Sequence, residues 1–152
     1  MKSKHLRRLI IAVLYMTDLH SESAVNLLMG TAAQESHMGL RIYQMNDGPA
    51  RGFFQMEPTT EQDIWKNYIR FKPDLKSMMH RAGFRGPDKT QLTGNLIYQI
   101  IMARLHYLRI PKRLPPDDDV MGMAQYWKKH YNTHKGRGKI LDFIQNYGEL
   151  AL

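Results

Sequence analysis

Glu35 is the residue whose position in this sequence most suggests chemistry. It falls on the same helical stripe as Leu28, Thr31 and Ala32, near the C-terminal end of a predicted helix. A carboxyl group there is partly removed from water, and the negative end of the helix dipole disfavours its charge. Both effects raise the pKa of the carboxyl group, as a general acid working near neutral pH requires. The position alone also fits a boundary glutamate that points into water.

Two further acidic residues, Asp47 and Glu57, flank residues 52–55, which read Gly-Phe-Phe-Gln. Cleavage of an acetal uses two carboxyl functions: one protonates the leaving oxygen, and the other stabilises the oxocarbenium-like state or activates water. A turn that brings acids and a glutamine beside a helix-end glutamate therefore suits glycoside cleavage. Each residue also has a plainer explanation, with Asp47 as a turn former, Glu57 as a first-turn helix charge and Gln55 as an exposed strand residue.

Three blocks carry a resemblance to a known family. Residues 35–39 read Glu-Ser-His-Met-Gly, residues 52–56 read Gly-Phe-Phe-Gln-Met, and Tyr131-Asn132 precedes Gly136 and Gly138. Together they resemble the signature of the goose-type lysozyme and lytic transglycosylase superfamily, over about residues 22 to 138. Two departures stand out: Phe-Phe replaces the common Leu-Met, and the late motif reads Tyr-Asn-Thr-His-Lys-Gly instead of Tyr-Asn-Ala-Gly.

The resemblance implies a peptidoglycan-degrading glycosidase. Glu35 would be the general acid that cleaves the β-1,4 bond between N-acetylmuramic acid and N-acetylglucosamine, without a cofactor or a metal. Asp47 and Glu57 fall near the positions where goose-type lysozymes hold water-positioning aspartates, which favours hydrolysis. Pro58-Thr59 fits the transglycosylase branch, whose products end in 1,6-anhydromuramic acid. Hydrolysis is therefore the first expectation and lytic transglycosylation the alternative.

The resemblance also implies a set of substrate-binding residues. Gln55 and the backbone near it would hold the N-acetyl group, Tyr131 would orient Glu35, and Ser36 would support the local hydrogen bonding. The expected substrate-binding residues are Ser36, Phe54, Gln55, Met56, Tyr131 and Asn132.

The fold class expected is α+β and mainly α-helical: a lysozyme-like catalytic domain spanning residues 1–152. Apolar periodicity predicts helices over about 5–17, from Ser21 to just before Gly39, and over 58–69, 73–81, 90–108 and 140–147, with another after Asp119. Residues 90–108 would form the central core helix, and Thr59 and Gln62 a capping box. Residues 40–56 break the helical period around the turn Asn46-Asp47-Gly48-Pro49, and their flanks 41–43 and 53–56 would pair as a small irregular β-hairpin beside the catalytic helix.

The composition limits the classes of partner and site that we expect for this chain. The chain has 152 residues, 22 Lys and Arg against 14 Asp and Glu, and a net charge of +8, so an acidic polymer or surface is expected to attract it. The absence of cysteine excludes disulfides, thiolate metal sites and a cysteine nucleophile. The sequence has no run of about 20 apolar residues that would cross a membrane. The basic residues before Leu9 only weakly imitate a secretory signal, so a first amphipathic helix is the better interpretation.

Two other classes of function stay open. The basic clusters at 2–8 and 135–139 suit a nucleic-acid-binding helical module, and the same fold could serve an inactive wall-binding protein. His130 and His134 have a metal-ligand spacing but no third ligand, so a surface position is expected for both. The preferred hypothesis is a monomer that acts on peptidoglycan strands in the bacterial periplasm or cell wall, with no nucleic acid and no stable membrane insertion. It would be a bacteriophage product, either an endolysin or a virion-associated enzyme.

Overall fold

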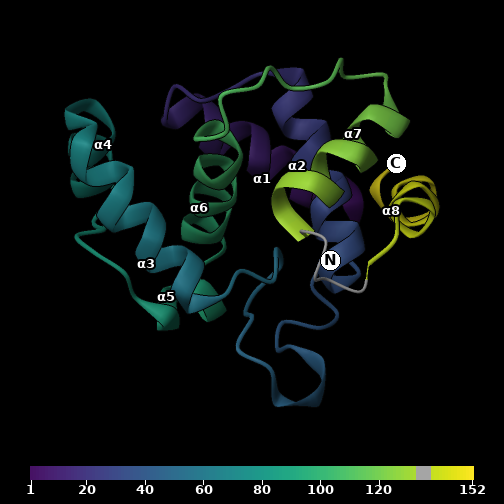
Figure 1. Cartoon of the computed structure of the whole chain (residues 1–152), viewed down its shortest axis with the longest axis horizontal. Helices are drawn as coiled ribbons and strands as arrows, with labels where there is room; N and C mark the ends of the chain where they lie inside the picture. Colours follow the sequence, from purple (N-terminus) through teal and green to yellow (C-terminus); the bar gives the residue numbers. More distant parts are fainter. Residues whose placement is uncertain (133–137) are drawn as a thin grey trace.

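The computed structural model describes residues 1–132 and 138–152, and it is mainly helical, as the sequence predicts. Figure 1 shows α3 and α4 at one side of the molecule and α7 and α8 at the other, with α2 and α6 between them. The α-helices of the described residues are α1 (Ser3–Met16), α2 (Glu22–Ser36), α3 (Pro58–Asn67), α4 (Pro73–Arg81), α5 (Lys89–Gly94), α6 (Leu96–Leu108), α7 (Val120–Trp127) and α8 (Ile140–Asn146). Short 3-10 turns at Met45–Asp47 and Ile69–Phe71 and π-helical turns at Lys128–Asn132 and Tyr147–Ala151 complete the helical elements.

The helix α2 lies at the centre of the fold. The hydroxyl of Ser21 accepts a hydrogen bond from the amide of Ala24 at 3.0 Å, so Ser21 is the N-cap of α2, and the helix begins where the sequence predicts. α1, α6, α7 and α8 all pack against α2. A Cβ atom at Gly30 would lie 2.4 Å from the ring of Phe143, so α8 approaches the backbone of α2 closely. The glutamate at the end of α2 is therefore held by a helix enclosed in the core.

The helix α3 is fastened to α6 by a buried polar network. The indole of Trp65 donates to the hydroxyl of Tyr98 at 2.9 Å, and that hydroxyl donates to the carboxyl group of Glu61. Glu61 also accepts from the amide of Asp88 at 2.8 Å. Burial raises the pKa of Glu61, although these hydrogen bonds oppose the effect. The network anchors α3, and with it the chain that leads into α3 from the site described below.

The predicted helix over 90–108 is wrong in one respect, because the chain forms two helices there. Asn95 interrupts the run with φ −112° and ψ 99°, and its side chain caps α6 by accepting from the amide of Tyr98. The apolar periodicity of residues 90–108 also predicts that Ile97 is buried, but it is 39% exposed. Of the other apolar residues in this periodicity, Leu92, Ile100, Ala103 and Tyr107 are buried, and Leu96 is half-buried.

The predicted β-hairpin is not formed as a strand pair within the described residues. Isolated antiparallel bridges join Tyr43 to Arg51 and Arg51 to Met56, so Arg51 pairs with one residue before it and one after it in the chain. The backbone takes left-handed conformations at Asn46, Asp47, Gly52 and Gln55, and it turns too often for a ladder to extend. In Figure 1 this segment extends below the helices.

The predicted capping box at the start of α3 is also wrong. Glu57 occupies the N-cap position and Pro58 follows it in the first turn. The hydroxyl of Thr59 contacts the Glu57 carboxylate at 3.4 Å instead of capping the helix.

None of the described helices combines the length and the apolarity needed to cross a bilayer.

Candidate active site

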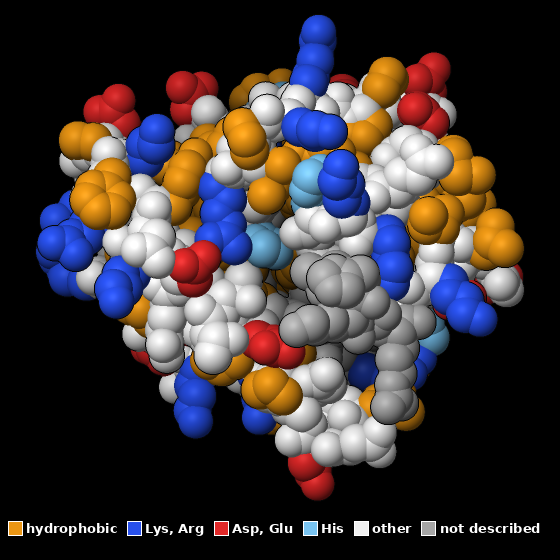
Figure 2. Space-filling view, in the orientation of Figure 1, with side chains coloured by type: hydrophobic (Ala, Val, Ile, Leu, Met, Phe, Trp, Pro, Cys, Tyr) orange, Lys and Arg blue, Asp and Glu red, His pale blue; other side chains and the backbone are white. Residues whose placement is uncertain are grey.

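A cleft of about 1140 Å³ opens beside the C-terminal end of α2. Its walls come from the end of α2, from the segment leading to α3, from the turn after α7, from α8, and from His106 of α6. Figure 2 shows Lys and Arg side chains distributed over the face of the molecule seen in Figure 1, as the net charge of +8 leads one to expect.

Glu35 lines the cleft and is half-buried. Its Oε1 accepts a hydrogen bond from the indole Nε1 of Trp127 at 2.8 Å. Burial raises the pKa of Glu35 from 4.5 to about 7, while the Trp127 hydrogen bond and the charge of Lys128 partly oppose this. Near neutral pH the carboxyl group therefore exists in both protonation states, as a group that gives and takes protons requires.

Trp127 sets the hydrogen bonding of Glu35, so a change at Trp127 tests this electrostatic account. In Trp127→Phe the indole donor that holds the pKa of Glu35 down is lost, and we expect that pKa to rise above 7. A ¹³C NMR titration of the glutamate carboxyl carbons measures the change. Trp65→Phe is the matched control, because the indole of Trp65 donates to Tyr98 instead. An unmoved Glu35 titration in Trp127→Phe would refute the assignment.

The turn at 52–55 is fixed from three sides. The amide of Gly52 donates to the carbonyl of Ile42 at 2.7 Å, and the amide of Phe53 donates to the side chain of Gln99 in α6 at 2.8 Å. The hydroxyl of Tyr131 donates to the carbonyl of Phe54 at 2.6 Å. These bonds hold the turn, and the glutamine that follows, at a defined place in the cleft wall.

Gly52 is required for this turn. Its φ is +81°, and an added Cβ would lie 2.3 Å from the backbone oxygen of Leu92. We expect Gly52→Ala to lower the free energy of unfolding by about 2 kcal/mol or more, since left-handed strain alone costs about 1–2 kcal/mol. Gly86→Ala is the control, because a Cβ there meets nothing within 4 Å. Urea unfolding measures both, and equal values for the two variants would contradict the expectation.

The structure separates the two other acidic candidates. Glu57 is exposed and lines the cleft together with Glu35. Asp47 is also exposed. Its neighbours Asn46 and Gly48 line the cleft, but Asp47 does not. Both acids were expected in the same role, but only Glu57 lines the cleft together with Glu35.

The expected substrate-binding residues also divide. Gln55, Met56, Tyr131 and Asn132 line the cleft. Ser36 is buried, donates to the carbonyl of Ala32 and accepts from the amide of Gly39, so it closes the end of α2.

Phe54 is buried as well, at 1% exposure, and contributes its carbonyl group to the fixed turn. The hydroxyl of Tyr131 donates to this carbonyl and not to Glu35, so the group that orients Glu35 is Trp127.

Four residues in or beside the cleft were not predicted from the sequence: Trp127 and Lys128 lie beside it, and His106 and Asp142 line it. Trp127 is fully buried in the core, and its indole also donates to Glu35. Lys128 donates to the side chain of Asn132 at 2.7 Å and to the carbonyl of Gly138 at 2.6 Å. All four were missed because helical periodicity does not show which residues of distant helices meet.

The described residues contain no cluster of three or more His, Asp or Glu side chains that would hold a metal ion. His130 is described, whereas His134 and most of the basic cluster at 135–139 lie outside the described residues.

Comparisons with protein-family models, with curated proteins and with solved structures found no match to this chain.

Proposed function

We propose that the protein is a glycosidase that cleaves β-1,4-linked N-acetylated glycans, with Glu35 as the general acid. The observation that carries the proposal is a glutamate with a pKa of about 7 in the wall of a large cleft. A carboxyl group that is still protonated near neutral pH donates a proton to the leaving glycosidic oxygen. The cleft volume of about 1140 Å³ exceeds the range of about 300–1000 Å³ usual for small ligands, which suits a polymer.

An exposed aromatic side chain supports a carbohydrate ligand. Tyr43 lines the cleft and is 60% exposed, and the guanidinium of Arg51 lies 5.2 Å from the centre of its ring. An aromatic face that remains open to solvent offers an apolar platform on which a sugar ring can pack.

The substrate class that fits best is peptidoglycan. The order of the Glu-Ser, Gly-Phe-Phe-Gln and Tyr-Asn blocks resembles the muralytic superfamily, and the net charge of +8 draws the protein toward an anionic bacterial envelope. The proposed site of action is therefore the bacterial cell wall.

Two reaction types remain as candidates on this site. Hydrolysis needs a group that positions water, and Glu57 is the acid of the expected pair that shares the cleft. Transglycosylation, in which the sugar's own hydroxymethyl group attacks, needs no such acid. The exclusion of Asp47 from the cleft lining favours this second route, so we keep it beside the first.

The choice between the routes yields a prediction for two variants. If water is activated in the cleft, Glu57→Gln is expected to lower turnover by about 10²-fold or more, the scale of lost general-base help. Asp47→Asn is expected to keep the wild-type rate because Asp47 lies outside the cleft lining. Initial rates on purified peptidoglycan measure both, and a wild-type rate in Glu57→Gln would favour the water-free route.

Product analysis tests the proposed function itself. Purified protein is incubated with peptidoglycan, and the released fragments are weighed by mass spectrometry. Reducing ends indicate the hydrolase, and anhydro ends indicate the transglycosylase. Sugar binding without any product would support the inactive wall-binding alternative, and tight, steeply salt-dependent DNA binding without cleavage would support the nucleic-acid-binding alternative.

A further inference from the structure

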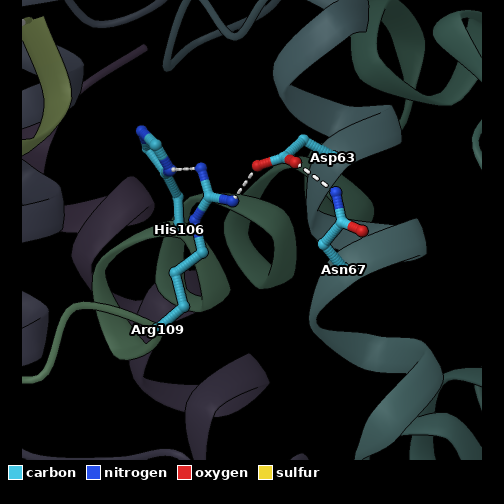
Figure 3. A network of polar contacts seen from close by, with 4 residues as sticks. All are labelled: Asp63, Asn67, His106 and Arg109. Atoms are coloured by element: carbon cyan, nitrogen blue, oxygen red, sulfur yellow. Dashed lines mark hydrogen bonds and ion pairs between the residues drawn. The ribbon is translucent and has the colours of Figure 1, made fainter.

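His106 is held by a polar network at the edge of the cleft. One ring nitrogen, Nδ1, lies 3.0 Å from a guanidinium nitrogen of Arg109. Another nitrogen of Arg109 contacts the carboxylate of Asp63 at 2.5 Å, and Asn67 donates to the second oxygen of that carboxylate at 2.7 Å. Figure 3 shows Arg109 between His106 and Asp63, with the other ring nitrogen of His106 pointing away from the network.

The network fixes where the ring proton lies. A guanidinium group has donors and no acceptor, so Nδ1 of His106 accepts and the proton resides on Nε2. Burial, and then the charge of Arg109, lower the pKa of His106 to about 3, so the ring stays neutral. The other charges that act on it are Asp63, which raises this pKa, and His130, which lowers it. His106 is therefore a neutral side chain with one fixed N–H donor.

That donor has no partner within the described part of the chain. Nδ1 makes the ring's only hydrogen bond there, and the ring packs edge-on against Tyr131 with 4.8 Å between centroids. His106 is 9% exposed, and it lines the cleft. Nε2 is not one of the described side-chain atoms that are buried without a partner, so this N–H group is open to water in the cleft, and a ligand acceptor can replace that water.

Gln55 offers the complementary function in the same cleft. Its side-chain nitrogen donates to the carbonyls of Gly52 at 2.9 Å and of Arg41 at 3.2 Å. Both neighbours are acceptors, so the orientation of the amide is determined, and its oxygen is left as an acceptor. The described cleft thus presents a fixed donor on His106 and a fixed acceptor on Gln55. An acetamido group has one carbonyl oxygen, which needs a donor, and one N–H group, which needs an acceptor.

We propose that His106 donates its Nε2–H to the acetamido carbonyl of an N-acetylated sugar in the cleft and thereby selects N-acetylated over unsubstituted glycans. Arg109 and Asp63 act as positioning residues that keep the donor on Nε2. The inference rests on the proposed function for its ligand class, but it concerns recognition and not bond cleavage.

The experiment measures binding in the Glu35→Gln protein, so that the ligand stays intact. The probes are the β-1,4-linked tetramer of N-acetylglucosamine and the β-1,4-linked tetramer of glucose, both uncharged. Adding His106→Phe is expected to weaken binding of the acetylated tetramer by about tenfold, on the scale of one lost hydrogen bond, and to leave the glucose tetramer unchanged. Adding His106→Gln, which keeps an N–H donor, is expected to bind the acetylated tetramer more tightly than His106→Phe does. His5→Phe, at an exposed histidine of α1, is the matched control.

A second measurement needs no variant at His106. Imidazole ¹⁵N NMR of the otherwise unmodified protein is expected to show the Nε2–H form, with a shift on addition of the acetylated tetramer, and Arg109→Leu is expected to release this tautomer. An Nδ1–H form, an unchanged preference in His106→Phe, or no binding of either tetramer would overturn the inference. If the protein cleaves peptidoglycan but His106→Phe keeps its preference for the acetylated tetramer, the inference is wrong and the proposed function stands. If the protein prefers the acetylated tetramer but cleaves nothing, the proposed function is wrong and the inference stands.

Discussion

Glu35→Gln is expected to lower the rate of glycan cleavage by about 10³-fold, within the usual range for the loss of a general acid. Glutamine has nearly the same shape and can still accept the hydrogen bond from Trp127, so the cleft is expected to stay intact. It has no proton of comparable acidity to give to the leaving oxygen. The rate on purified peptidoglycan, taken from released fragments, measures the effect.

The control for this variant is Glu22→Gln, which removes a charge from the same helix at its exposed first turn, far along α2 from the cleft. It is expected to retain the wild-type rate. Because Glu35 must be protonated to act, wild-type activity is also expected to fall as the pH rises through about 7. Equal rates for Glu35→Gln and wild type would remove Glu35 from the mechanism.

The sequence predicted the central features of the fold because they depend on local signals. Ser21 marks the start of α2, and the spacing of its apolar residues placed Glu35 on the buried side near the end of the helix. The predicted bounds of 73–81 are those of α4, since a proline begins that helix and Gly83 follows it with φ +92°. These signals lie within a few residues of the element that they define.

The features that the sequence did not predict depend on contacts between distant residues. Glu35 and Trp127 are 92 residues apart, and no local pattern shows that the indole donates to the carboxyl group. Likewise, the network from His106 reaches Asp63 on another helix. The break at Asn95 is different, because Gly94-Asn95 is a local signal for the end of one helix and the cap of the next. The strong apolar periodicity on either side of it concealed that signal.

The stability of the protein is expected to depend on pH through Glu35. Burial raises the pKa of this carboxyl group, so ionising it costs more free energy in the folded state than in the unfolded state. The pKa is about 7 in the folded chain against 4.5 for an ordinary glutamate, so the folded state binds the proton more tightly than the unfolded state. The resulting stabilisation is complete below about pH 4.5 and is lost as the pH rises through about 7. The loss amounts to about 2–3 kcal/mol when screening by cleft water is allowed for.

Glu35→Gln removes this titration, so comparing the variant with wild type isolates it from every other ionisable group. The free energy of unfolding of the variant, relative to wild type, is expected to increase by about 2–3 kcal/mol between pH 4.5 and pH 8. Urea unfolding at several pH values measures the difference, and an unchanged dependence on urea concentration shows that both proteins unfold with the same exposure of surface. A difference that stays constant across this range would mean that the Glu35 carboxyl group is solvated like an exposed one, and a general acid active near neutral pH would then have no physical basis at this position.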